Sequence, residues 1–442
     1  MRVASDSCPP GTDRLGSPLL AAVQPNPRAC RWLWTGQLIS NLGTQISLYG
    51  IGLWSFARQG QLLDFAAVAF VVQLAKILVL PLLGRRLPGW PPGRVMLIAN
   101  GFGAACTMAL GVQLLLRGDL STLPLLLFLA LAAMAEAALV LCFASLIPVL
   151  VREPSALARA NGLFVSADGL VLSLAPFAGS WLVGVLGLPG VLLLDGVSFV
   201  IAMVCVLRAG LPQRTLVGGQ VRPIQLQPRE RLRGLWRQAA VRPLLVVGTT
   251  MAFVYASTEV LFPAWLIAGL GRSRLGPALL LGAAGYVLGY QFWTRWGWRH
   301  PRPLLGLGLL LQSLILMGAG LVAFEDRLGF WYGGLMVFSL LLPMALAALQ
   351  TLWQKLAPPE QLSRLLAQRY RLEWLARLVA FAGTAVLVDR LLRPSLAWPH
   401  WPAWLIGSLG QGPGRPLAVG LGAMGWVLLF AWFRVQRRWV QT

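Results

Sequence analysis

Twelve long, mostly apolar segments divide this sequence and limit its fold more than any other feature. A helix that crosses a membrane needs about 20 mostly apolar residues, and each segment is close to that length or longer. The segments span residues 35–57, 65–84, 94–116, 122–150, 158–186, 189–207, 243–269, 275–294, 303–324, 330–354, 364–391 and 415–434. With 57% hydrophobic and 12% charged residues, the chain is too apolar for a water-soluble fold. The sequence therefore predicts an all-α polytopic membrane protein with twelve transmembrane helices.

The segments fall into two groups of six, separated by a polar interval. We expect a disordered cytoplasmic tail at 1–30, a six-helix half at 31–207, a basic cytoplasmic linker at 208–242, a second six-helix half at 243–434 and a cytoplasmic tail at 435–442. Many secondary transporters are built from such repeats and bind their substrate between them, near the bilayer midplane. A twelve-span membrane enzyme or a channel would show the same hydropathy, so this pattern alone leaves the function open.

The distribution of positive charge predicts the orientation in the membrane. The chain has 37 Lys and Arg against 15 Asp and Glu, a formal net charge of +22. If the N-terminus is cytoplasmic, 28 of the 37 fall on the cytoplasmic side, eight fall outside and Lys76 lies within the bilayer. The cytoplasmic group includes Lys355, Arg364, Arg369, Arg371 and Arg377. Cytoplasmic loops are rich in Lys and Arg, so both termini are expected in the cytoplasm, and the net charge needs no nucleic-acid partner.

Missing motifs exclude several classes of function. Neither lysine, Lys76 nor Lys355, stands in the G-x-x-x-x-G-K sequence of a phosphate-binding loop, so we expect no ATP-driven pump. His300 and His400 are far apart and the five cysteines lack C-x-x-C spacing, so we predict neither a metal site nor a disulfide. A membrane enzyme would need a cluster of acids or histidines in its loops. The chain is therefore predicted to be no enzyme and to need no cofactor.

Five stretches of the sequence carry a family resemblance. They are RWLWTGQLISNLGTQ (31–45), SLIPVLVREPSALARANGLF (145–164), LPGVLLLDGVSF (188–199), GAAGYVLG (282–289) and LWQKLAPPEQLSRLLAQR (352–369). In order and spacing they resemble major facilitator superfamily exporters of the macrolide-efflux and enterobactin-exporter type, over about residues 31–434. The resemblance implies the major facilitator fold and proton-coupled export of an amphipathic organic compound, such as a drug, siderophore or other secondary metabolite, by alternating access. We expect a monomer in the plasma (cytoplasmic) membrane, with a small organic substrate, protons and the lipid bilayer as partners.

Two positions depart from the pattern of that superfamily. The loop after the second span usually carries a Gly, an Asp four residues later and then Arg-rich residues, and this cluster helps to hold and switch the outward-facing state. The gating residues that match are Gly84, Arg85, Arg86 and Arg94. Pro88 stands at the Asp position, and the fifth span has APFAGS (175–180) where related antiporters have G-P-x-x-G-G. Pro88 therefore leaves open a transport-inactive relative that acts as a membrane scaffold. The apolar character of the chain also permits a second alternative, transport of lipid or lysolipid.

Four ionisable residues are predicted to lie at bilayer depth, where a charge costs on the order of 2.5–3.5 kcal/mol and usually marks a pathway. They are Lys76 in the second span, Glu136 in the fourth, Asp168 in the fifth and Glu259 toward the outer part of the seventh. We interpret them as a proton-coupling group in which Glu136 or Asp168 binds the proton and Lys76 tunes it. The alternative is a Lys–carboxylate pair that only holds helices together. Asp195 is assigned a structural role.

Neutral polar residues are the candidates for a substrate cavity. They are Gln37, Asn41 and Gln45 in the first span and Tyr255, Tyr286 and Tyr290 in the seventh and eighth. The first three are spaced four residues apart, so they share one face of a helix. Hydrogen bonding between helices explains them almost as well, and membrane tyrosines are often packing or interface residues.

Overall fold

The computed structural model describes residues 27–59, 62–119, 121–151, 153–211, 241–270, 275–297, 299–321, 328–356, 359–388 and 415–439. All regular elements within these ranges are helical, so the predicted all-α fold is confirmed. Most of the predicted N-terminal tail and of the basic linker, and the last three residues, lie outside the described residues.

In the described part of the first half, five α-helices and a short turn follow one another. They are α1 (Pro27–Gln59), α2 (Leu62–Arg86), the 3₁₀ turn η2 (Leu87–Gly89), α3 (Pro92–Arg117), α4 (Thr122–Leu150) and α5 (Pro154–Arg208). The 55 residues of α5 are interrupted at Gly187, whose φ of 68° and ψ of 170° are not helical. Glycine adopts a positive φ at little cost. Gly187 therefore divides α5 into two limbs, and the break falls where the sequence separates the fifth span from the sixth.

The described residues of the second half include six α-helices and the short π-helical segment η4. They are α7 (Val241–Leu270), α8 (Leu275–Phe292), the π segment η4 (Trp293–Gly297), α9 (Pro301–Leu321), α10 (Leu328–Gln354), α11 (Pro359–Val386) and α14 (Arg415–Trp439). Together with the two limbs of α5, the described helices give the twelve spans that the sequence predicts.

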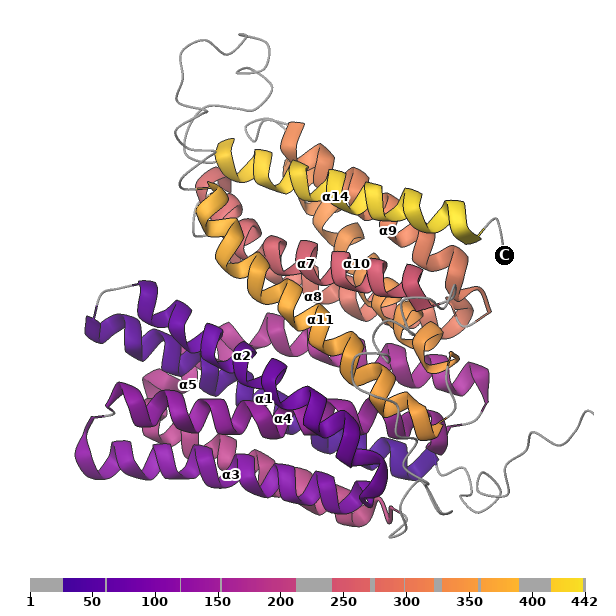
Figure 1. Cartoon of the computed structure of the whole chain (residues 1–442). Helices are drawn as coiled ribbons and strands as arrows, with labels where there is room; N and C mark the ends of the chain where they lie inside the picture. The colour runs from indigo at the N-terminus through magenta and orange to yellow at the C-terminus, as the bar shows by residue number, and fades with distance from the viewer. Residues whose placement is uncertain are drawn as a thin grey trace, which may run out of the picture.

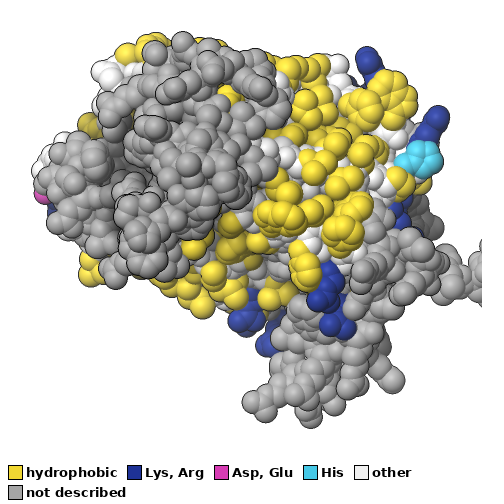
Figure 2. Space-filling model, turned by 90° about the horizontal axis from the view of Figure 1, so that it is seen from above, with side chains coloured by type: hydrophobic (Ala, Val, Ile, Leu, Met, Phe, Trp, Pro, Cys, Tyr) yellow, Lys and Arg dark blue, Asp and Glu magenta, His cyan; other side chains and the backbone are white. Residues whose placement is uncertain are grey.

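The outer surface of the bundle is largely apolar. Seven described helical segments are long and apolar enough to cross a membrane. Leu116, Leu123 and Trp181 expose more than half of their surface, and a broad hydrophobic face is visible in Figure 2. Soluble monomers rarely expose apolar patches of this kind, whereas helices facing lipid require them. α11 is not among the seven segments, because charged residues lie along its length.

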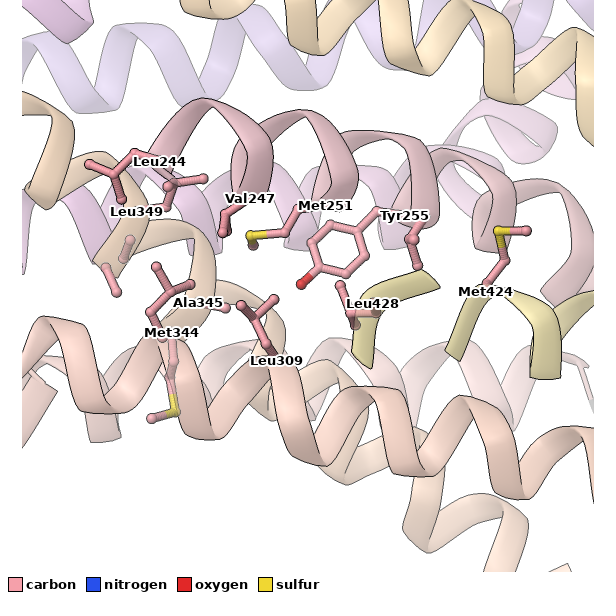
Figure 3. Close-up of a cluster of buried hydrophobic side chains, with 14 of the residues drawn as sticks. Leu244, Val247, Met251, Tyr255, Leu309, Met344, Ala345, Leu349, Met424 and Leu428 are labelled. Carbon is pink, nitrogen blue, oxygen red and sulfur yellow. The ribbon is translucent and has the colours of Figure 1, made fainter. Parts of the chain in front are cut away.

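The C-terminal half has one large apolar core. Figure 3 shows Leu244, Met251, Leu309 and Leu428, which join α7, α9 and α14. Tyr255 belongs to the same core, packs edge-on against Phe338 and is only 6% exposed. The N-terminal half is held together by several smaller clusters.

The two halves touch through α2 and α4 against α11, and through α5 against α8 and α10. In Figure 1, α11 crosses from the C-terminal half onto the N-terminal half, and the halves converge towards the end of the bundle where the C-terminus lies. The helix termini at this end, which we call the closed end, include Arg86, Leu150, Pro154, Gly297, Gln354 and Pro359. Leu80, Ala144 and Ala158 of the N-terminal half extend the C-terminal core here, so apolar packing closes this end.

Candidate functional site between the two halves

An ion pair joins α2 and α4 inside the N-terminal half. Lys76 Nζ lies 2.7 Å from Glu136 Oε1, and the two side chains are 12% and 25% exposed. The same ammonium group lies 5.8 Å from the centre of the Trp374 ring on α11, within the range of a cation–π contact. Lys76 therefore interacts with a carboxylate in its own half and with an aromatic ring of the opposite half.

Asp168 on α5 is an accessible carboxyl group of the site. Asn41 Nδ2 on α1 donates a 2.8 Å hydrogen bond to Asp168 Oδ1. None of the ion pairs among the described residues includes Asp168, although it is close enough to Glu136 and Lys76 to interact with both electrostatically. Its side chain is exposed despite its place in the middle of an apolar limb. Asp168 is thus a carboxylate whose observed partner is a neutral amide.

The next residue along α5 brings the opposite half close. A Cβ atom placed on Gly169 would lie 2.1 Å from Tyr286 Cδ1 on α8, so glycine is required for this approach. Tyr286 is half-buried and interacts electrostatically with Asp168, Glu259 and Arg377. Tyr286 is therefore near both the acidic group of the N-terminal half and the charged pair of the C-terminal half.

A second ion pair joins α7 and α11 in the C-terminal half. Arg377 Nη2 donates to both carboxylate oxygens of Glu259, at 3.0 and 2.8 Å, and the side chains are 28% and 42% exposed. Arg377 lies 18 residues after the first residue of α11, about 27 Å along the helix axis. Arg377 therefore lies deep in the helix and not near its first residue, where the sequence-based charge count placed it. Glu259 neutralises its charge there.

Arg369 on α11 is also neutralised inside the helix bundle. Only 4% of it is exposed; its Nε lies 2.7 Å from Glu373 Oε1, and its Nη1 donates to Gln350 on α10. The guanidinium group also faces the rings of Trp353 and Tyr370. A buried charge is tolerated when it is paired and hydrogen-bonded. Arg369, like Arg377, therefore leaves the cytoplasmic loop count, but removing both still leaves a strong bias in charge.

Polar contacts between the halves concentrate at the closed end. Asn161 Nδ2 on α5 donates to Thr351 Oγ1 at 2.9 Å and to Gln354 Oε1 at 2.6 Å, both on α10. Gln354 Nε2 in turn donates to the Ala144 carbonyl at 3.1 Å, and Trp293 Nε1 donates to the Ala158 carbonyl at 2.5 Å. These four hydrogen bonds are buried and cross from one half to the other, so they exist only while this end is closed.

The predicted gating residues lie at the same end. A Cβ atom on Gly84 would lie 2.6 Å from Ala367 Cβ on α11, so Gly84 allows α2 and α11 to approach. Arg85, Arg86 and Arg94 are exposed, and none of them takes part in an ion pair within the described residues. Close backbone approach is thus the observed contribution of this motif to the contact between the halves.

The neutral candidates separate into two groups. Gln37 and Gln45 are half-buried on α1, as is Tyr290 on α8, which packs near Gly162 of α5. Tyr255 is different, because its hydroxyl group donates a 2.7 Å hydrogen bond to Gln312 Oε1 in the core of the C-terminal half. Its burial assigns Tyr255 to helix packing instead of to a cavity wall.

Sequence reasoning missed three of the residues that join the helices here. Arg377, Trp374 and Asn161 contact Glu259, Lys76 and α10, respectively. Arg377 had a visible signal, since arginines within an otherwise apolar segment need partners at bilayer depth. Asn161 and Trp374 had none, because their partners are far away in the sequence.

This arrangement defines a class of protein: a twelve-helix membrane bundle of two halves with a charged centre and one closed end. The sequence profile of the Major Facilitator Superfamily matches residues 33–381. The chain therefore belongs to the major facilitator superfamily, whose members are membrane transporters, and it is an integral membrane protein. No curated protein matches the chain.

Solved structures agree with this assignment at the level of the fold. The human organic anion transporter MFSD10 (TETRAN) is similar with a TM-score of 0.67 and 16% identity, over 93% of this chain and 100% of that chain. A bacterial homologue of the iron transporter ferroportin, in an outward-facing state, is similar with a TM-score of 0.68 and 18% identity, over 93% of this chain and 98% of that chain.

Proposed function

We propose that this protein is a secondary active transporter that exports an amphipathic organic compound in exchange for protons, by alternating access. The observation that carries the proposal is the state of Asp168, an exposed carboxyl group in mid-helix whose observed hydrogen-bond partner is the neutral Asn41. Ionisable residues in membrane helices usually mark a substrate or ion pathway. A carboxyl group without a fixed counter-ion is able to take up and release a proton as its surroundings change.

The other acids at bilayer depth are less suited to this task. Glu136 and Glu259 are each held by a cation, at 2.7 and 2.8 Å, so protonating either one leaves its partner without a counter-charge. This comparison favours Asp168 over Glu136 as the proton site. Lys76, which is electrostatically coupled to Asp168, favours the ionised carboxylate, and we assign it the tuning role.

The closed end indicates which side of the membrane the transporter is open to. If both termini are cytoplasmic, as the charge bias indicates, then the closed end is the cytoplasmic end and the protein is open to the outside. The ferroportin homologue of similar fold is outward-facing as well. Protons would then reach Asp168 from outside, and their binding would precede the change to the inward-open state that accepts substrate from the cytoplasm.

The nature of the substrate is proposed from the residues around Asp168. Tyr286 and Trp374 offer aromatic faces beside charged groups, which suits a compound with an apolar body and a polar end. Among the described residues, the charges near Asp168 are of both signs, because Glu136 is paired with Lys76 and Glu259 with Arg377. Such a mixture does not favour a strongly charged ion. We therefore keep amphipathic organic compounds as the substrate class.

Dye accumulation in inside-out membrane vesicles tests the proposal. Ethidium, fluorescein and Nile red represent cationic, anionic and neutral amphipathic compounds. We expect energised vesicles that contain the protein to accumulate at least one dye, and an uncoupler to abolish this accumulation. Vesicles with Asn41→Leu should accumulate less, whereas Tyr255→Phe, a change in the distant core, should have little effect. Accumulation that resists the uncoupler, or none in any vesicle, would contradict proton-coupled export.

A further inference from the structure

A small cavity of about 30 Å³ lies within the N-terminal half, between α1, α2, α3, α4 and the second limb of α5. Most of its lining is apolar, but five oxygen-bearing side chains also face it. These are Thr44, Ser47, Thr107, Glu136 and Asp195. A water molecule needs roughly 10–15 Å³ on such a measure, so the cavity has room for one ion together with a water molecule.

Asp195 supplies an unsatisfied oxygen at this cavity. The residue is 1% exposed, and its Oδ1 accepts hydrogen bonds from Thr44 at 3.4 Å and from Ser198 at 3.2 Å. Its Oδ2 has no hydrogen-bond partner. Buried charges in proteins are normally paired or bound to a metal ion, and an orphaned buried oxygen demands an explanation. No Lys or Arg lines the cavity, so Asp195 has no cationic partner among the residues around it.

The charges around the cavity indicate what could fill it. Glu136 lines the cavity while its Oε1 is paired with Lys76, so with Asp195 ionised the three residues Asp195, Glu136 and Lys76 would together carry one negative charge. Carboxylate and hydroxyl oxygens are hard ligands, which bind hard cations and not soft transition metals. We propose that this cavity binds one sodium ion, held by Asp195 and Glu136 with help from the surrounding hydroxyl groups.

Such an ion would act on the centre of the protein through Glu136. A cation beside Glu136 competes with Lys76 for the same carboxylate, and Lys76 also faces Trp374 of the opposite half. Occupancy of the cavity is therefore linked to the contact between the halves, and linkage of this kind is reciprocal. The site is separate from Asp168, whose side chain does not line the cavity.

Equilibrium binding of ²²Na⁺ to the purified full-length protein in detergent tests this inference. Choline chloride keeps the ionic strength constant. We expect saturable binding of about one ion per chain, and a rise in the unfolding temperature of about 3 °C or more at saturating sodium. Because the assay involves neither organic substrate nor transport, its failure would not bear on the proposed export.

Three variants make the test specific. Asp195→Asn should abolish sodium binding, and Thr107→Val, which keeps the shape but loses a hydroxyl oxygen, should weaken it about tenfold. Tyr255→Phe should bind sodium like the parent, because Tyr255 lies in the core of the C-terminal half, away from the cavity. The inference is wrong if the parent shows no saturable binding of sodium. It is also wrong if Asp195→Asn and Thr107→Val both fold and bind sodium as the parent does, or if calcium displaces sodium at an equal or lower concentration.

Discussion

Asn161 offers the sharpest test of how the closed end is held. Replacing it with leucine preserves the approximate volume but removes the donors to Thr351 and Gln354. All three side chains are at most 5% exposed, so Gln354 Oε1 is left buried without this donor. These bonds join the two halves and form only while this end is closed. The substitution therefore destabilises the present state and leaves a state with this end open unaffected.

The size of the shift follows from the two lost bonds. Leaving buried polar groups unpaired costs about 1–3 kcal/mol each, and Thr351 keeps its bond to the Ala347 carbonyl, so we take about 2–3 kcal/mol in total. Since 1.4 kcal/mol corresponds to a factor of ten, Asn161→Leu should raise the population open at this end roughly 30- to 150-fold.

A buried cysteine reports this population. Ser363 on α11 is 5% exposed and lies beside Gly84, so Ser363→Cys is a nearly isosteric reporter in a background without the native cysteines. Its rate of reaction with a maleimide in detergent should rise by the same factor in Asn161→Leu. Tyr255→Phe is the matched control, because it removes one buried hydrogen bond inside the C-terminal half. An unchanged rate in Asn161→Leu, or an equal rise in the control, would refute the reasoning.

Three other predictions follow from the contacts and the charge pattern. Gly169→Ala should lower the unfolding temperature because its methyl group would meet the Tyr286 ring at a cost of about 1–3 kcal/mol, and adding Tyr286→Ala should restore it. Arg377→Gln should lower that temperature by no more than about 3 °C, because its partly exposed ion pair is worth at most about 1 kcal/mol; a fall several times larger would oppose this. In intact cells, a cysteine at Gly118 should react with a membrane-impermeant thiol reagent while one at Gly218 should not, and the reverse would overturn the orientation.

The general fold could be predicted because apolar length is a local property of the sequence. Eleven of the expected segments are long apolar runs, and even the break at Gly187 falls at the glycine between two such runs. The span that corresponds to α11 is harder to predict from the sequence, because Arg369 and Arg377 make it look amphipathic. Its charges are satisfied by Gln350, Glu373 and Glu259, and hydropathy alone carries no information about such partners.

The candidate site could be predicted only in part. Lys76 and Glu136 are rare charges at bilayer depth, so the sequence predicts a Lys–carboxylate pair as one of two alternatives, and the structure shows such a pair. The bond between Asn41 and Asp168 joins residues 127 positions apart, which no spacing rule reaches. Tyr255 differs from the prediction in another way. Its residue type suggests a cavity wall, but the packing of α7 directs its side chain towards the core.

The central claim is that Asp168 carries the coupling proton, and dye transport by proteoliposomes tests it most directly. The parent should accumulate a transported dye against its gradient when a pH gradient is imposed, and should also exchange it downhill without one. Asp168→Asn keeps the shape of the side chain and an oxygen that can accept the hydrogen bond from Asn41, but it cannot bind or release a proton. Uphill accumulation should therefore be lost while downhill exchange persists. Glu259→Gln is the matched control and should keep both activities. Uphill accumulation by Asp168→Asn at the rate of the parent would contradict the account.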